Sequence, residues 1–291
     1  MDKDKVFELL ETSGRLPALP ETISQILNAL NNPTSVDIEE LAEKVSSNPY
    51  LTELIIESVN SGFFHLRREI NSIREAIAFL GLQTVQNLLI FLITRQFFPG
   101  GRANGNRTFH MARYWKHVIG TSVACCMLSE RINAGDQYKL FSYGLIHDIG
   151  ISVLDMCLPE ILDEVSEKLK SGVHQIIAER VVMGGITHAD IGAWLCRRWN
   201  IREDITAIVE HHHTPLLAKV NTEDVKLVYL ADEISTEYYE KLLGVHLAHG
   251  MNKNIMESVG VTFQDREFIS QALPSEVEKT AGYFLLNRTV S

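Results

Sequence analysis

An adjacent pair, His147 and Asp148, lies within the very apolar stretch from Leu140 to Gly150. These neighbours exclude a solvated helix face, and a carboxylate among apolar side chains is costly unless hydrogen bonds or a cation satisfy it. Successive residues of a helix project about 100° apart. The pair could therefore reach one metal ion from two sides or bridge two ions. The alternative is a pair that hydrogen bonds satisfy within an ordinary core.

Two further histidines occupy inward helical positions or helix ends. His117 shares a small, apolar helix face with Gly120. His188 lies in the first turn of a helix that Thr187 and Asp190 are expected to cap. The helix dipole there disfavours protonation and so favours a neutral imidazole that can bind metal. The plain alternatives are a hydrogen-bonded core histidine and a surface histidine.

Three consecutive histidines end the next helix before Pro215, and Asp232 lies on a helix face of small or apolar residues. Imidazole and carboxylate ligands without thiolate suit iron, manganese, zinc, nickel or magnesium. The set exceeds what one ion needs and could support two ions, with Asp148 able to bridge them. The candidate metal ligands are His117, His147, Asp148, His188, two of the run His211 to His213, and Asp232.

Helical periodicity dominates the chain, and no strand-like alternation is sustained in its first third. We therefore predict an all-α fold, in which the His147–Asp148 pair belongs to one continuous buried helix. A glycine-rich linker from Pro99 to Gly105 is expected to divide the chain. The expected units are an N-terminal helical bundle over residues 1–100, a metal-binding helical domain over 108–245, and a C-terminal helical extension over 246–291.

The C-terminal extension is expected to form three short helices, over residues 252–259, 263–273 and 275–286. Its histidines, His246 and His249, are three residues apart, a spacing that can hold a metal on a helix. We interpret them as surface residues. No function follows from this segment alone.

The net charge of -10 and the pI near 5.6 argue against binding to duplex nucleic acid, because no basic surplus exists to release counterions. A small phosphorylated ligand stays compatible with this charge. The four cysteines lack Cys-x-x-Cys spacing, as expected for buried thiols of a cytoplasmic protein. The longest apolar run, Leu88 to Ile93, falls far short of the roughly 18 residues of a membrane span. No signal peptide and no membrane association are expected.

The order His117, His147–Asp148 and Asp232 resembles the signature of the HD metal-dependent phosphohydrolase superfamily. His188 and His212–His213 resemble the additional ligands of the HD-GYP cyclic-dinucleotide phosphodiesterases. Over Leu16 to about Leu243, the chain is most similar to the HDOD family of bacterial signalling proteins. The matching segments are Leu16–Leu19 with Pro20, Val59–Ser61, Ile73–Gly81, Tyr114–Trp115, Leu145–Gly150, Thr187–Gly192 and His212–Pro215.

The HDOD resemblance implies a regulatory protein that binds one or two metal ions in an HD-like domain. Iron or manganese is expected first, with zinc, nickel or magnesium as alternatives. The implied partner is a signalling protein or a small phosphorylated ligand such as a nucleotide. Many HDOD members have lost the metal ligands, whereas this sequence retains them.

The alternative is a metal-dependent phosphohydrolase or phosphodiesterase that acts on a nucleotide or cyclic dinucleotide. The HD-GYP signature continues with Gly-Tyr-Pro after its histidine pair, whereas Thr214 to Leu217 follow here. Hydrolysis of cyclic dinucleotides therefore does not carry over with the resemblance. A one-residue shift in the match would also replace His213 by His211. The candidate phosphate-holding residues are Arg113, Lys116, Arg180 and Arg197.

Overall fold

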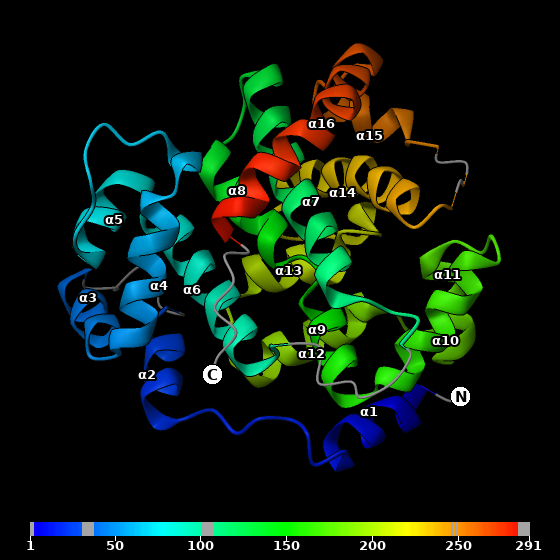
Figure 1. Cartoon of the computed structure of the whole chain (residues 1–291), viewed down its shortest axis with the longest axis horizontal. Helices are drawn as coiled ribbons and strands as arrows, with labels where there is room; N and C mark the ends of the chain where they lie inside the picture. Colours follow the sequence, from blue (N-terminus) through cyan, green and yellow to red (C-terminus); the bar gives the residue numbers. More distant parts are fainter. Residues whose placement is uncertain (1–2, 31–37, 100–106, 246, 248–249, 285–291) are drawn as a thin grey trace.

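A computed structural model of the chain describes residues 3–30, 38–99, 107–245, 247 and 250–284. The described residues form helices joined by turns, with no strand among them, so the prediction of an all-α fold is confirmed (Figure 1). The α-helices are α1 (Lys3–Thr12), α2 (Glu21–Leu30), α3 (Ile38–Ser46), α4 (Pro49–Asn60), α5 (Ile73–Leu80), α6 (Leu82–Phe97), α7 (Met111–Ile132), α8 (Gln137–Ile146), α9 (Ile149–Cys157), α10 (Pro159–Lys170), α11 (Gln175–Val182), α12 (His188–Arg198), α13 (Glu203–His211), α14 (Thr222–Leu242), α15 (Lys253–Ser258) and α16 (Phe263–Phe284). Two short 3₁₀ helices are η1 (Gly62–Phe64) and η2 (Pro215–Leu217).

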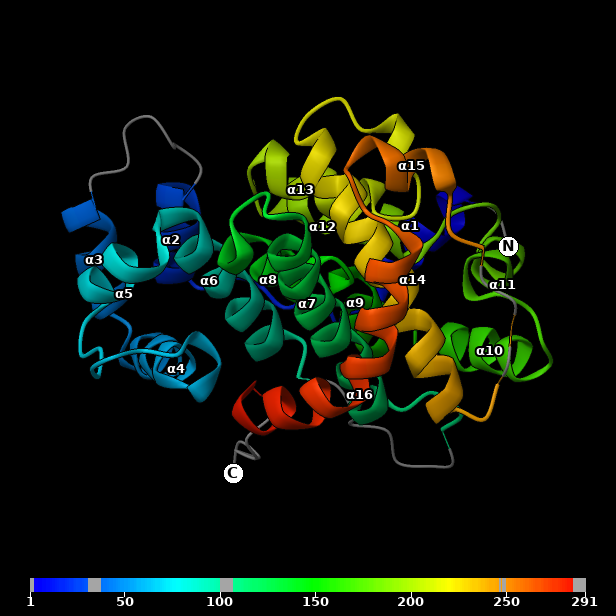
Figure 2. The ribbon, with the colours of Figure 1, turned by 90° about the horizontal axis from the view of Figure 1, so that it is seen from above.

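Helices α2 to α5 gather at one side of the molecule, and α6 connects them with the rest (Figures 1 and 2). The side chains of α6 are buried from Thr84 to Thr94, because the helix packs against α4 on one side and α8 on the other. Two polar contacts, one of them fully buried, fix this junction. Asn87 Nδ2 donates to Ser142 Oγ on α8 over 2.9 Å, and Arg202 donates to Gln86.

Helices α7, α8 and α14 form the centre of the molecule, and α9, α12 and α13 complete the core beside them. Close packing requires small residues at the contacts. A Cβ on Gly150 of α9 would lie 1.9 Å from the carbonyl oxygen of His188. A Cβ on Gly120 of α7 would lie 2.4 Å from Ser235 Oγ on α14. Glycine at these positions lets the helices that carry the candidate ligands approach one another.

Helix α1 lies apart from α2 to α5, across the molecule and against α12 (Figures 1 and 2). The ring centroids of Phe7 and Trp194 are 6.0 Å apart, and Val6 and Leu10 are fully buried. The beginning of the described chain is therefore anchored on the helix that starts at His188.

The His147–Asp148 pair does not lie within one continuous helix, which corrects the sequence prediction. Helix α8 ends at Ile146, the pair forms a turn, and α9 begins at Ile149. Asp148 has φ −104° and ψ 22°, outside the helical values. Apolar periodicity on both sides of the pair concealed this break, because both helices are buried. The turn places the Asp148 carboxylate between groups that come from several helices.

The C-terminal extension also differs from the prediction, because α16 runs unbroken from Phe263 to Phe284 through Pro274. A proline inside a helix removes one backbone hydrogen bond and costs roughly 3 kcal/mol. Ile269, Leu273 and Val277 are fully buried along α16, which packs on α7. Burial of this stripe outweighs the interruption. Three parts of the predictions lie outside the described residues. They are residues 285 and 286 of the predicted last helix, the linker residues from Gly100 to Gly105, and the two histidines His246 and His249.

One stretch among the described residues, Gln137–Cys157, is long and apolar enough to cross a membrane by length and composition alone. Its mean hydropathy is 1.2, and 94% of the apolar window is buried inside the protein. The stretch consists of α8, the His147–Asp148 turn and α9. Its apolar composition is accounted for by its place in the core.

Candidate metal centre

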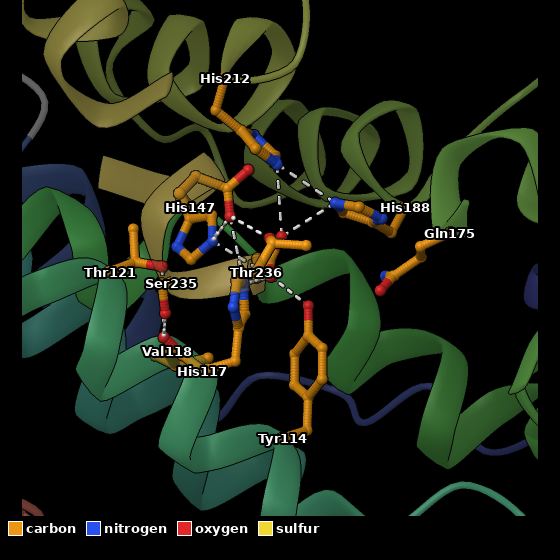
Figure 3. A network of polar contacts seen from close by, with 12 residues as sticks. Tyr114, His117, Val118, Thr121, His147, Gln175, His188, His212, Ser235 and Thr236 are labelled. Atoms are coloured by element: carbon orange, nitrogen blue, oxygen red, sulfur yellow. Dashed lines mark hydrogen bonds and ion pairs between the residues drawn. The ribbon is translucent and has the colours of Figure 1, made fainter. Parts of the chain in front are cut away.

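The structure brings together seven residues that the sequence singles out as candidate metal ligands. Figure 3 shows His117, His147, His188 and His212 pointing toward one centre. All of the seven are buried except His213, which is partly exposed. The seven-residue cluster consists of His117 from α7, His147 and Asp148 from the turn before α9, His188 from α12, His212 and His213 after α13, and Asp232 from α14.

The first donor group consists of His117, His147, Asp148 and Asp232. His117 Nε2 lies 3.1 Å from Asp148 Oδ2 and 3.2 Å from Asp232 Oδ1. His147 Nε2 lies 3.1 Å and 3.5 Å from the same two oxygens. Two imidazole nitrogens and two carboxylate oxygens therefore surround one point.

The second donor group consists of Asp148, His188, His212 and His213. It uses the other oxygen of the shared carboxylate, because Asp148 Oδ1 lies 2.8 Å from His188 Nε2 and 3.3 Å from His212 Nε2. His188 Nε2 also lies 3.1 Å from His212 Nε2 and 3.1 Å from His213 Nε2. Asp148 thus takes part in both groups, one oxygen in each.

The protonation of two rings shows what the donor atoms can bind. The Nδ1 atoms of His147 and His212 lie 2.7 Å and 2.8 Å from the carbonyl oxygens of Gly144 and Val209. A carbonyl only accepts, so each Nδ1 carries a proton, and each ring can present a bare Nε2 to a metal ion once Nε2 is deprotonated. Ligand nitrogens about 2.1 Å from one ion and about 90° apart lie about 3.0 Å from each other, close to the spacing seen between His188 and His212.

Several donor atoms in the cluster make short contacts but no hydrogen bond with any described residue. These buried atoms include His147 Nε2, Asp148 Oδ1 and Asp232 Oδ2. Buried polar atoms are ordinarily satisfied. A divalent cation would satisfy all three at once, and the donor set of imidazole and carboxylate fits such an ion. The residues present therefore fit the metal ions that the sequence implies.

The charges of the cluster point in the same direction. Burial opposes ionisation of Asp148, but His147 and His188 outweigh it and hold the pKa of Asp148 well below its usual value. Burial likewise opposes protonation of His147, yet Asp148 and Asp232 raise its pKa to about 10. The buried carboxylates of Asp148 and Asp232 are thus stabilised by positive charge close to them. Metal ions can supply it in place of these protons, which metal binding would release.

The surroundings of His188 correct one expectation from the sequence. The capping box of α12 is present, with Thr187 N donating to Asp190 Oδ2 over 2.8 Å. The helix dipole was expected to keep His188 neutral. Burial does oppose its protonation, but Glu179 and Asp148 outweigh burial and raise the pKa of His188 well above its usual value. Two adjacent carboxylates are stronger than the partial charge of a helix end.

Two further residues contact the cluster and were not predicted from the sequence to belong to the site. The Tyr114 hydroxyl donates to Asp148 Oδ2, and Glu179 accepts from His188. Tyr114 belongs to the Tyr114–Trp115 segment of the family resemblance, which is the signal that could have identified it. Glu179 lies on α11, for which the sequence offered no functional motif.

The histidine run places His212 and His213 in the cluster and leaves His211 outside it. His211 Nδ1 lies 3.5 Å from Thr214 Oγ1. His213 Nδ1 lies 3.4 Å from Asp232 Oδ2, in addition to its contact with His188. This geometry supports the match in which His212 and His213 form the pair.

A cavity of about 420 Å³ opens beside the cluster. Of the four candidate phosphate-holding residues, Arg180 lines this cavity. Lys116 instead pairs with Glu278 over 2.5 Å, and Arg197 pairs with Glu210. The cavity is lined by Tyr114, His117, Asp148, His174, Gln175, Ile176, Arg180, His188, His213, Tyr229, Asp232, Glu233, Thr236, Glu240 and Gly250.

The fold and the cluster together define an all-α protein with a candidate centre of histidine and aspartate ligands for a divalent metal. The family model of the HDOD domain matches residues 16–215. The chain therefore belongs to the HDOD domain family.

Individual relatives are distant. An uncharacterized protein of Treponema pallidum (strain Nichols) is 25% identical over an alignment of 241 residues, and the match covers 78% of this chain and 45% of that protein. The chain thus spans less than half the length of this curated relative.

Two crystal structures share the fold. One comes from Marinobacter aquaeolei VT8 and is provisionally named a signal transduction protein. It is 19% identical to this chain, with a TM-score of 0.70, and the match covers 98% of this chain and 64% of that chain. The other, provisionally named a phosphohydrolase, comes from Shewanella amazonensis SB2B; it has 20% identity, a TM-score of 0.66, and coverage of 95% and 97%.

Proposed function

We propose that this HDOD protein binds two divalent metal ions in the seven-residue cluster and hydrolyses a small phosphorylated ligand, such as a nucleotide, in the adjoining cavity. The observation that carries the proposal is the shared carboxylate of Asp148, whose two oxygens serve the two donor groups. One ion would take His117, His147, Asp148 and Asp232 as ligands. The other would take Asp148, His188, His212 and His213.

The metal is proposed to be iron or manganese, because imidazole and carboxylate donors suit these ions. Zinc, nickel and magnesium are the alternatives, and elemental analysis of the purified protein would distinguish them. Bound ions of this kind lower the pKa of water and neutralise the charge that develops on a phosphoryl group.

The residues of the chain contribute position and charge to this chemistry. Tyr114 holds the shared carboxylate through its hydroxyl, and Thr236 Oγ1 lies 3.4 Å from Asp232 Oδ1. Arg180 brings a guanidinium to the cavity wall, where it would pair with a phosphate oxygen. The position of the cluster at a cavity gives a ligand access to both donor groups.

The first test is the metal content of freshly purified protein, measured by elemental analysis without added metal. The proposal predicts two transition-metal ions per chain. Turnover of phosphomonoesters, nucleotides and cyclic dinucleotides is then measured, with Asp148→Asn as the variant that should lose both ions and activity. Protein that holds no metal after reconstitution with iron, manganese and zinc would refute the proposal.

A second candidate function is a regulatory module that binds the phosphorylated ligand or a signalling partner without turning it over. The composition of the cavity favours this candidate. Arg180 is the one lysine or arginine in its described lining, and Glu233 and Glu240 lie in the same wall. Such a wall offers little positive charge of its own to a phosphate. Metal-dependent binding without hydrolysis would support this candidate over the first.

Both candidates share the expectation of a cytoplasmic bacterial protein that binds neither membranes nor duplex nucleic acid. The acidic net charge supports the second part of this expectation. The name of the Marinobacter relative supports a signalling role, and the name of the Shewanella relative supports hydrolysis.

A further inference from the structure

Glu179 is a fully buried carboxylate that lies outside both donor groups. It lies on α11, nine residues before His188 in the chain, and is 0% exposed. Three donors reach it. The backbone nitrogen of His188 donates to Oε2 over 2.8 Å, His188 Nδ1 lies 2.8 Å from both oxygens, and Gln175 Nε2 donates to Oε1 over 3.0 Å. Such a group persists in a core only when its partners satisfy it.

The contact with Nδ1 determines how the His188 ring faces the cluster. Oε2 of Glu179 already accepts from the backbone nitrogen of His188 and Oε1 from Gln175 Nε2, so Nδ1 of His188 is the donor in this contact. Nε2 then points at the cluster, 2.8 Å from Asp148 Oδ1 and 3.1 Å from His212 Nε2. The bidentate contact with Glu179 also fixes the plane of the ring.

His188 differs in this respect from His147 and His212, whose Nδ1 atoms donate to backbone carbonyls. A carboxylate partner raises the basicity of the imidazole more than a carbonyl does, and it can be removed by a single substitution. The orientation of His188 is therefore the point where a side chain outside the cluster controls a proposed ligand.

We infer that Glu179 is a positioning residue that holds His188 in the Nδ1–H form for the metal ion of the second donor group, and that Gln175 orients Glu179 in turn. This inference rests on the proposed two-ion centre. Outer partners of this kind affect metal affinity by about 10- to 100-fold. The effect should fall on one ion of the two. Among the hydrogen bonds and ion pairs of the described residues, Glu179 contacts His188, and it contacts no residue of the first donor group directly.

The test compares Glu179→Ala, Glu179→Gln and wild type in titrations of the full chain with Mn²⁺ in competition with a chelator. In Glu179→Ala, the dissociation constant of one ion should rise by about 10- to 100-fold, while that of the other stays unchanged. Glu179→Gln should recover part of the loss, because its amide oxygen still accepts from Nδ1. Gln175→Ala should weaken the same ion by less.

A second readout follows the ring directly. In Zn²⁺-loaded protein with ¹⁵N-labelled histidine, the His188 signals are identified by their absence in His188→Ala. Wild type should show a protonated Nδ1 and a metal-bound Nε2. Glu179→Ala should broaden or shift these signals, and Glu179→Gln should restore them in part. A role limited to packing would leave them unchanged.

Asp155→Asn provides the matched control, because Asp155 is a buried carboxylate that pairs with Arg107 over 3.1 Å and lies on α9, seven residues after Asp148. It should lower thermal stability and leave both Mn²⁺ affinities unchanged. If the Glu179→Ala variant folds and binds both ions as wild type does, the inference is overturned, while the proposed function stands. Equal weakening of both ions would show a structural role and overturn it too. Wild type that binds no ion would overturn the proposed function together with the inference.

Discussion

Asp148→Asn is the substitution that most directly tests the shared carboxylate. The change keeps the size of the side chain and removes one negative charge. Asp148 lies within 3.3 Å of His117, His147, His188 and His212. An asparagine there can donate to a bare Nε2 in the metal-free protein, so the fold should persist. It cannot supply a carboxylate oxygen to each donor group, so both ions should be lost.

The size of the effect follows from the coupling of binding to folding. Free metal at about 100 times its dissociation constant stabilises the folded protein by about 2.7 kcal/mol per ion, hence about 5 kcal/mol for two ions. A change of 1 kcal/mol shifts Tm by about 2 °C in a domain of this size. Wild type should therefore lose roughly 10 °C in Tm when a chelator removes the metal.

The assay is a thermal melt of wild type and Asp148→Asn, each with metal and with chelator, accompanied by elemental analysis. Wild type should melt lower with chelator, whereas Asp148→Asn should melt at one temperature in both conditions. Asp155→Asn should respond to chelator as wild type does, from a lower starting Tm. An Asp148→Asn protein that retains two ions and the full response to chelator would refute the assignment of the shared ligand.

Three further predictions test other parts of the structure. Gly150→Ala should lower the free energy of unfolding by about 1–3 kcal/mol and weaken metal binding, because the new methyl group would displace the first turn of α12 and with it His188. An unchanged thermal melt and an unchanged metal content would contradict the close packing. His213→Ala should lower the metal content, whereas His211→Ala should leave it unchanged, and elemental analysis of the two variants decides the register of the histidine run. At physiological salt, a gel-shift assay should show no complex with duplex DNA, and a tight complex that weakens steeply with salt would contradict the charge argument.

The sequence predicted the parts of the fold that depend on helical periodicity and end signals. The capping box at Thr187 and Asp190 is present as expected. Polar residues on otherwise apolar helix faces, such as His117 and Asp232, proved to be buried and directed at one another. A buried polar side chain needs a partner, so its presence in an apolar pattern indicates a site even before the fold is known.

The remaining features depend on contacts between distant elements. Pro274 is a strong local signal for a helix end, but burial along α16 overrides it. The turn at His147 and Asp148 is hidden because the residues on both sides are equally apolar. Glu179 could not be singled out from the sequence, since an isolated glutamate on a short amphipathic helix is ordinarily solvated. Its burial results from the placement of α11 against the start of α12.

The position of α1 has a consequence for the synthesis of the protein. Phe7 leaves the ribosome early, but its aromatic partner Trp194 belongs to a helix that is made much later. At 5–20 residues per second, the roughly 190 intervening residues take about 10–40 s to translate. During that interval, α1 cannot bury Val6 and Leu10 at their final location. Helix α1 therefore docks only after α12 has been made, and until then its apolar face lacks the partner that it has in the folded protein.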